Sequence, residues 1–230
     1  MKLLDARVHA IEWLSDGVIG IELRPCDIAD WPIVTAGAHI DLFLPNGLTR
    51  SYSLTNRPGE SHRYTVAVAM DAASRGGSIF VHNDLRVGQK IRISAPRNHF
   101  PVDESASHSV FIAGGIGITP IWCMVQRLSQ IGSTWEVHYS ARARTNAAFV
   151  DQVVSLAEQT GNAVHLTFDG GVRGLNDEFV KALRSPDVRQ RLASRGFEPG
   201  GSTPGAFAEL IQADEKKWPV VVKQAGLHRE

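Results

Sequence analysis

The sequence predicts a chain in two halves, a small antiparallel β-barrel followed by a partial parallel βαβαβ sheet, with a helical tail. Short alternating strands with tight turns fill residues 1–100, as is typical of small barrels. From residue 109 strands and helices alternate, which indicates a parallel sheet. Capped helices follow from about residue 175. We therefore expect three domains, at 1–103, 104–174 and 175–230.

Alternation of apolar and polar residues locates the strands of the barrel, since a strand with one buried face has a period of two. The alternating segments are 8–10, 19–23, 40–44, 50–54, 64–70 and 91–93. Asp16-Gly17 and Asn46-Gly47 separate two pairs of these segments, and such dipeptides form tight hairpin turns. One or two helical turns are expected over 78–85. Together these segments predict about six antiparallel strands.

The second half predicts a doubly wound sheet. Its expected strands and helices, in chain order, are 109–113, 119–131, 135–140, 146–159 and 163–168. The first strand of such a sheet normally lies centrally, so Phe111–Ala113 would be left as an apolar edge. We expect helices after Leu175 to cover this edge, or the protein to self-associate, because exposed edges pair readily.

Composition excludes several classes of protein. The 230 residues are 43% hydrophobic, with 24 basic and 24 acidic side chains, so we expect no nucleic-acid or membrane partner. No charged-then-apolar leader opens the chain and no apolar run reaches ~20 residues, which favours a cytoplasmic protein. Cys26 and Cys123, expected to be buried thiols, are too few for a four-thiolate iron–sulfur site. No cluster of histidine, cysteine and carboxylate has metal-ligand spacing, so no metal is expected.

A glycine-rich turn at 114–117 joins the first strand and the first helix of the second half. Val110–Ile121 reads VFIAGGIGITPI, in which Thr119 is a good helix N-cap and Pro120 suits the first helical turn. Glycines admit close backbone approach, and a helix N-terminus attracts anions. The turn therefore fits the pyrophosphate of a dinucleotide. The alternative is an ordinary βα turn, because the glycine pattern alone is a weak signal.

The strongest chemical signal is RSYSL, residues 50–54, on the return strand of the second hairpin. Alternation puts Arg50, Tyr52 and Leu54 on one face and the two serines on the other. The guanidinium can bind a phosphate and the tyrosine ring can stack on a flat ring. The alternative for Arg50 is a solvated strand charge.

A second phosphate cradle is indicated by Arg75-Gly76-Gly77-Ser78. Ser78 is placed to cap the short helix that follows, and a helix start is a common phosphate site. A plain loop is the alternative for the two glycines. The two motifs together, followed by the turn at 114–117, are less readily explained as accidents.

With these motifs the chain resembles the ferredoxin–NADP reductase superfamily, and most closely its phthalate dioxygenase reductase type, which includes vanillate demethylase reductases. The resemblance covers residues 4–172 and includes APRNHF at 95–100. It implies a flavin in the barrel, usually FMN with FAD as the alternative, and NADH or NADPH as substrate. The implied reaction is hydride transfer to the flavin, then passage of single electrons to an oxygenase component or a separate iron–sulfur carrier.

The resemblance also implies roles for individual residues. Arg50 would bind the flavin phosphate, Tyr52 would stack on the isoalloxazine, Ser53 would lie near flavin N5, and Leu54 would also be a cofactor-binding residue. Tyr52 and Ser53 are the expected catalytic residues. The residues expected to contact the flavin phosphate or the nicotinamide nucleotide are Gly77, Ser78, Gly114, Gly115, Thr119, Pro120, Ser140 and Arg142.

The chain then departs from the family pattern. No Cys-Gly-Pro turn and no iron–sulfur domain follow Phe168-Asp169, so we expect a truncated reductase with impaired turnover, although residues 1–105 would still bind flavin. Residues 175–228 resemble instead the C-terminal end of tripartite tricarboxylate transporter solute-binding proteins. This leaves two hypotheses, a flavin-dependent reductase component and a non-catalytic solute-binding remnant, which the colour of the purified protein would distinguish.

Overall fold

The computed structural model describes residues 2–27, 30–71, 74–168, 186 and 189–190. The chain divides into two compact units, Met1–Leu175 and Asn176–Glu230. The helices and the edge cover expected after Leu175 lie outside the described residues, except that Pro186, Arg189 and Gln190 are helical. The fold described below is that of the first unit.

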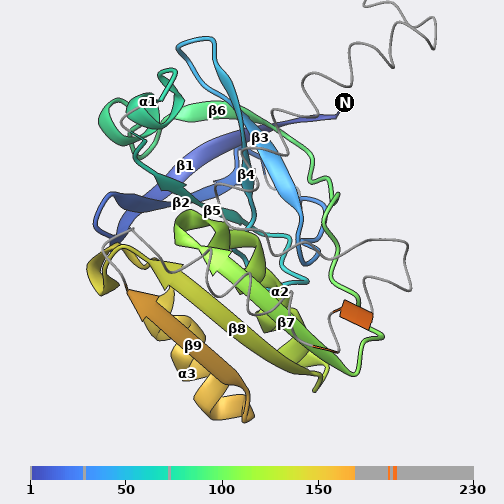
Figure 1. Ribbon diagram of the computed structural model, residues 1–230. Coiled ribbons are helices and arrows are strands. Elements are labelled where there is room, and N and C mark those ends of the chain that lie inside the picture. The colour runs from blue at the N-terminus through green and yellow to red at the C-terminus, as the bar shows by residue number, and fades with distance from the viewer. Residues whose placement is uncertain (1, 28–29, 72–73, 169–185, 187–188, 191–230) are drawn as a thin grey trace, which may run out of the picture. The chain divides into compact units, whose positions relative to one another are not determined.

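Six antiparallel strands form the predicted barrel (Figure 1). They are β1 (Leu3–Ser15), β2 (Val18–Pro25), β3 (His39–Phe43), β4 (Thr49–Ser53), β5 (Tyr64–Ala69) and β6 (Lys90–Ser94). Their order in the sheet is β4-β3-β6-β1-β2-β5, and an isolated bridge between Leu54 and Val66 joins the two outer strands. The sheet thus closes on itself, and α1 (Gly77–Asn83) spans the connection from β5 to β6.

Both predicted hairpin turns are present. Gly17 has φ 74° and Gly47 has φ 82°, a conformation that glycine adopts without the steric cost of a Cβ. The β1–β2 pair closes at Ser15 and Val18, directly around Asp16-Gly17. The strand β1 is longer than expected, at 13 residues, and carries two irregularities in its pairing with β2. Bulges of this kind let a long strand bend around a barrel.

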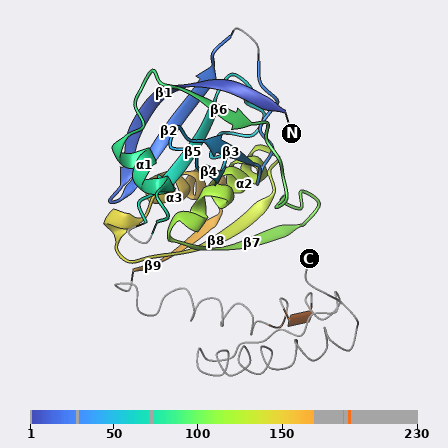
Figure 2. The same cartoon turned by 90° about the horizontal axis from the view of Figure 1, so that it is seen from above.

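The predicted parallel strands are β7 (His108–Gly114), β8 (Thr134–Ala141) and β9 (Ala163–Phe168), in the order β7-β8-β9. The helices α2 (Ile118–Gln130) and α3 (Val150–Thr160) lie on the side of this sheet that faces the barrel (Figure 2). Trp135, Val137 and Tyr139 of β8 are buried beneath them. Within the described residues β7 is an edge strand, as expected.

Three expected helix starts are wrong. Gly76, at φ 89°, precedes α1, so the helix begins before Ser78 can cap it. A 3-10 turn at Gly115–Gly117 runs directly into α2, which leaves no extended cap position for Thr119. The helix predicted from residue 146 begins at Val150, because Phe149 has φ 61° and interrupts the helical path.

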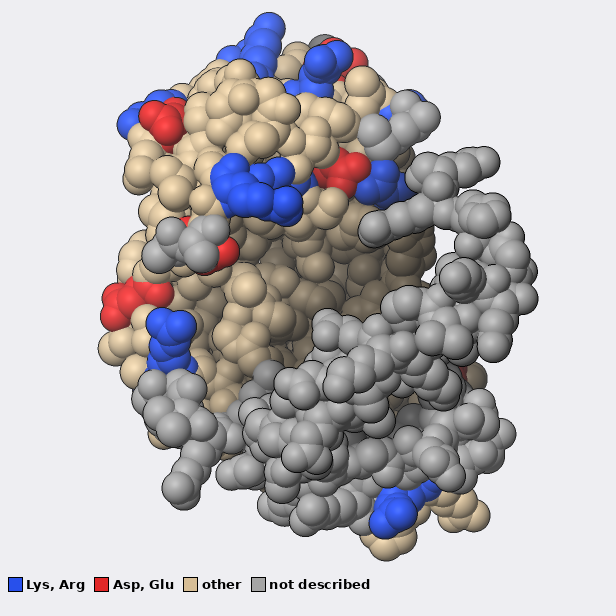
Figure 3. Space-filling view, turned by 45° about the horizontal axis from the view of Figure 1, so that its top comes forward, with Lys and Arg blue, Asp and Glu red and all other residues tan. Residues whose placement is uncertain are grey.

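Charged side chains of both signs are interspersed over the described surface in the view of Figure 3, where one group of basic side chains borders a recess. That view shows no continuous basic surface of the kind that follows a nucleic-acid backbone. No helix within the described ranges has the length and apolar character needed to cross a bilayer.

Candidate functional site

Arg50 and Gly77 come from distant parts of the sequence and lie against each other. The Arg50 guanidinium donates hydrogen bonds from Nη1 to the Thr49 carbonyl at 2.8 Å and from Nη2 to the Arg75 carbonyl at 3.3 Å. A Cβ added at Gly77 would lie 2.5 Å from Arg50 Nε, closer than real Cβ atoms approach other atoms. The two predicted phosphate motifs therefore form one cradle, in which glycine makes room for the arginine.

Ser78 belongs to the same loop, and its side chain does not cap α1 as predicted. Its Oγ accepts a hydrogen bond from the backbone N–H of Asp71 at 3.2 Å. This bond ties the start of α1 to the segment that follows β5. The hydroxyl is half-buried, beside Gly77.

Tyr52 and Leu54 share a face of the barrel strand, as the alternation predicted, but differ in exposure. Tyr52 is half-buried and packs at the margin of the barrel core. Burial raises the pKa of its hydroxyl, with Arg50 acting in the opposite direction, so the phenol stays protonated. Leu54 is fully buried and its N–H donates to the Ala38 carbonyl, so its side chain is unavailable to a ligand.

Ser53 pairs with His39 of β3, whose ring meets that of His99 edge-on, with centroids 5.2 Å apart. Burial is the largest cause that lowers the pKa of His39, followed by the charges of Arg97 and His99, while Asp41 opposes them. His39 is therefore neutral at physiological pH. Ser53 is thus paired across the two strands with a residue whose imidazole is neutral.

A buried carboxylate that the sequence analysis missed supports this strand. Asp41 accepts hydrogen bonds from Ser51 Oγ to Oδ1 and from Arg97 Nη2 to Oδ2, both at 2.6 Å. Burial acts to raise the pKa of Asp41, but these two bonds, together with the charges of Arg97 and His39, outweigh it and hold the pKa below its usual value. The sequence contains its partner Arg97 in the APRNHF segment, which the sequence analysis noted without singling out this arginine.

The glycine turn lies at the carboxyl edge of the parallel sheet. Gly115 has φ 48°, with open space where a Cβ would stand. Thr119 Oγ1 donates to the Ile116 carbonyl at 3.0 Å, which fixes the turn from inside, and Pro120 follows in the first turn of α2. The strand register pairs Gly114 with Ser140. Ser140 is therefore beside the turn.

Arg142 is exposed and follows the end of β8. The turn at 115–117 contacts both β8 and the barrel strand β5. Leu54, at the end of β4, bridges to Val66 of β5, so the RSYSL motif and the glycine turn both adjoin β5. The cavity of about 440 Å³ beside the β3–β4 hairpin is lined by none of the predicted site residues.

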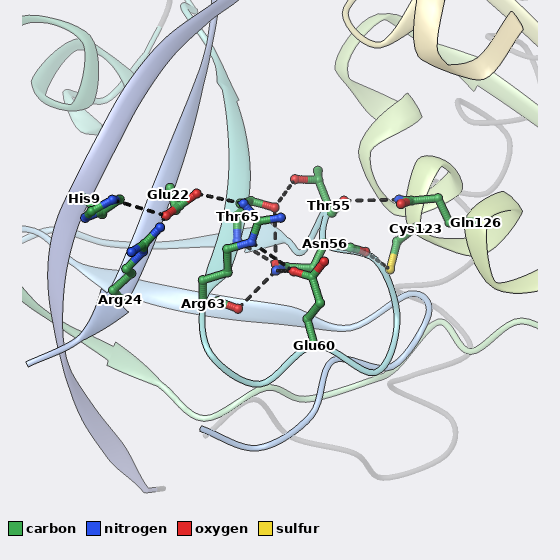
Figure 4. A network of polar contacts seen from close by, with 10 residues as sticks. All are labelled: His9, Glu22, Arg24, Thr55, Asn56, Glu60, Arg63, Thr65, Cys123 and Gln126. Carbon is green, nitrogen blue, oxygen red and sulfur yellow. Dashed lines mark hydrogen bonds and ion pairs between the residues drawn. The ribbon is translucent and has the colours of Figure 1, made fainter. Parts of the chain in front are cut away.

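Hydrogen bonds fix the barrel to α2 directly after the RSYSL motif (Figure 4). Cys123 Sγ donates to the Asn56 carbonyl at 3.2 Å, and Gln126 Nε2 donates to the Thr55 carbonyl at 3.3 Å. Burial raises the pKa of the Cys123 thiol to about 12. This thiol is buried as expected, whereas Cys26 is partly exposed.

The same loop is anchored to the barrel strands by a partly exposed polar network. Asn56 Oδ1 accepts from the Thr65 N–H at 2.6 Å, and its amide donates to Glu60 Oε2 at 2.9 Å. Arg63 bridges Glu60 and Glu22, at 3.0 and 2.8 Å. The segment between the two candidate binding regions is thus held from both sides.

Comparison with known proteins agrees with this arrangement, although no protein-family model matches the chain. The chain is 49% identical over 177 residues to phenoxybenzoate dioxygenase subunit beta of Ectopseudomonas oleovorans, covering 76% of this chain and 54% of that protein. It is 42% identical over 236 residues to a Comamonas testosteroni chain named as a reductase subunit of the toluene-4-sulfonate monooxygenase system, covering 96% and 74%.

Among solved structures, phthalate dioxygenase reductase matches with a TM-score of 0.72 and 32% identity, covering 80% of this chain and 57% of that one. The chain thus spans little more than half the length of that reductase and of the Ectopseudomonas relative. The Comamonas alignment extends past Leu175, and none of these three proteins is a solute-binding protein, so the resemblance of residues 175–228 to such proteins is not confirmed. Shared sequence, fold and motifs establish that the chain belongs to the ferredoxin–NADP reductase superfamily and, within it, to the phthalate dioxygenase reductase type.

Proposed function

We propose that the chain is a flavin-dependent reductase that takes electrons from NADH or NADPH and passes them to a Rieske-type oxygenase or demethylase, directly or through an iron–sulfur carrier. The relatives support this, since the solved phthalate reductase is described as transferring electrons from pyridine nucleotides to [2Fe-2S]. Residues 1–103 would bind the flavin and residues 104–174 the nucleotide, with 175–230 as a separate tail.

The observation that carries the proposal is the Arg50–Gly77 cradle beside Tyr52. A guanidinium held against a glycine backbone leaves its remaining N–H groups for a phosphate. One such cradle suits the single phosphate of FMN, which we prefer to FAD. Tyr52, two residues along the same strand, is then placed to stack on the ring that the phosphate positions.

Ser53 would donate a hydrogen bond at the reactive edge of the flavin. Two ring systems must lie face to face for hydride transfer, and the chain's contribution is to hold them there. The turn at 114–117, with Thr119, Pro120, Ser140 and Arg142, would bind the nucleotide so that its nicotinamide ring faces the flavin. A bound flavin supplies the chemistry that side chains lack, because it accepts two electrons together and releases them singly.

Flavin titration tests the proposal. Arg50→Ala removes a charge-assisted contact worth about 1.5–3 kcal/mol, so the affinity for FMN should fall roughly ten- to a hundredfold. Arg7→Ala is the matched control, because Arg7 is an exposed strand arginine on β1 whose guanidinium donates to the Gly88 carbonyl, away from the cradle. FMN fluorescence quenching gives both affinities, and FAD titrated in parallel tests the preference.

Anaerobic mixing of the flavin-loaded protein with NADH, and separately with NADPH, then tests electron uptake through bleaching of the flavin band. Purified protein that is colourless and binds neither flavin would refute the proposed function and favour the solute-binding alternative. Equal FMN affinity for the wild type and Arg50→Ala would remove Arg50 from the site while leaving the reductase assignment standing.

A further inference from the structure

Three side chains on the parallel sheet form a cluster that the sequence analysis did not anticipate. Glu136 and His138 are two residues apart on β8, and the register pairs His138 with His165 on β9. Period-two alternation puts all three on one face. The neighbouring residues Trp135 and Val137 are buried under the helices, so the cluster lies on the face opposite α2 and α3.

The metal-binding atoms of these residues converge. His138 Nε2 lies 2.5 Å and His165 Nε2 lies 3.3 Å from the same carboxylate oxygen, Glu136 Oε1. The two imidazole rings stack with centroids 4.6 Å apart and an interplanar angle of 20°. One potential donor atom from each of the three residues lies within 4.8 Å of the others. A fourth group, His108 Nε2, is 3.9 Å from Glu136 Oε2.

The chemistry of the donors selects the kind of ion. Two imidazole nitrogens and one carboxylate oxygen suit zinc and the neighbouring transition metals, whereas calcium and magnesium prefer oxygen ligands throughout. Donors around a tetrahedral zinc stand roughly 3.3 Å apart, as follows from bond lengths of about 2.0–2.2 Å. The His165–Glu136 separation already has this value, and rotation of the side chains can bring the other donors to it.

Exposure allows an ion to enter. The side chains of Glu136, His138 and His165 are 30%, 19% and 54% exposed. The site is therefore bounded by the sheet on one side and accessible on the other, with the His165 ring at its rim. A salt-bridge cluster that only stabilises the sheet is the competing interpretation.

We propose that Glu136, His138 and His165 bind one divalent transition-metal ion of the zinc class, with a water molecule or His108 as the fourth ligand. The proposal is independent of the flavin and nucleotide sites, because none of its three residues has a part in them. Ser140 is two residues beyond His138 on the same strand face, about 7 Å along the strand, so the metal would lie behind the nucleotide edge of the sheet.

Isothermal titration calorimetry with zinc chloride tests the site, using the full chain without a polyhistidine tag after treatment with a chelator. We expect one equivalent of zinc to bind to the wild type. His165→Ala and Glu136→Gln should each weaken this binding at least about tenfold, since loss of even an outer-sphere partner costs 10–100-fold. His62→Ala, which removes an exposed histidine before β5, should leave it unchanged.

Cobalt supplies a second readout, because Co²⁺ in a tetrahedral site absorbs visible light more strongly than the hydrated ion. Circular dichroism of each variant shows that it is folded. Absence of zinc binding by the wild type would overturn the proposal, as would unaltered affinity in folded His165→Ala and Glu136→Gln. Loss of binding in His62→Ala to the same extent would also overturn it, since the zinc would then bind surface histidines generally.

Discussion

Gly77→Ala separates the flavin site from the stability of the barrel. The added Cβ would lie 2.5 Å from Arg50 Nε and 2.8 Å from Arg50 Cγ, so the arginine must leave its place. Its bond to the Arg75 carbonyl, worth about 0.5–1.5 kcal/mol, is then lost. Alanine at Gly77, the first residue of α1, restricts the unfolded chain more than glycine does and so gains about 0.4–1 kcal/mol. The two effects nearly cancel, and the free energy of unfolding should change by less than about 1 kcal/mol.

Affinity for FMN should respond differently, because the displaced guanidinium no longer reaches the phosphate. We expect a loss of about ten- to a hundredfold, the value of one charge-assisted contact. Urea denaturation measures the stability and fluorescence titration measures the affinity, each on the protein with and without Gly77→Ala.

A double-mutant cycle with Arg50→Ala identifies the cause. If Gly77 acts through Arg50, adding Gly77→Ala to Arg50→Ala should lower the affinity no further. An equal loss in both backgrounds, or no loss in the wild-type background, would refute the reasoning that the glycine exists to make room for the arginine.

Two further predictions concern the support of the barrel. Asp41→Asn should lower the free energy of unfolding by about 1–3 kcal/mol at pH 7, because Arg97 and Ser51 lose a charged acceptor. Since the folded state lowers the pKa of Asp41, the stabilisation by this carboxylate is present above about pH 4 and fades as the pH falls through the folded-state pKa. Urea titrations of both proteins at several pH values measure this, and a cost that does not change with pH would contradict it. Gly37→Ala should lower the free energy of unfolding by at least about 3 kcal/mol, since its Cβ would lie 1.9 Å from the Phe100 carbonyl oxygen at φ +90°. Gly47→Ala is the control, because Gly47 has φ +82° with nothing within 4 Å of the added Cβ, and it should lower that free energy by only about 1–2 kcal/mol. Equal losses in the two variants would show that the contact at Gly37 is unimportant.

Local patterns predicted the barrel strands well, because burial of one face of a strand requires apolar residues at every second position. Alternation predicted a strand at 64–70, where β5 is Tyr64–Ala69, and the glycines at 17 and 47 marked the hairpins. Helix caps were predicted less well, since a hydroxyl such as that of Ser78 or Thr119 suits many positions. Neighbouring glycines decided where those helices begin.

Contacts between distant residues were beyond such patterns. Asp41 and Arg97 are 56 positions apart, and His165 meets Glu136 and His138 only through the register of β8 with β9. Nothing local in the sequence specifies that register. The candidate phosphate cradle was predicted as two separate motifs, and only the structure shows that Arg50 of one motif packs against Gly77 of the other.

The two halves also exchange parts of their hydrophobic cores. Cys123 and Met124 of α2 are buried in the barrel core, while Val18 and Ala67 of the barrel are buried with the α/β half. A fragment that ended at residue 103 would therefore have a cavity in place of the Met124 side chain. By analogy with truncation of a buried methionine, this cavity should lower its free energy of unfolding by about 2–5 kcal/mol. The boundary near residue 103 between the proposed flavin-binding and nucleotide-binding residues is thus not a boundary between independently stable folding units. Residues 1–175 should melt as one cooperative unit, and the shortest fragment able to hold a flavin well should include α2.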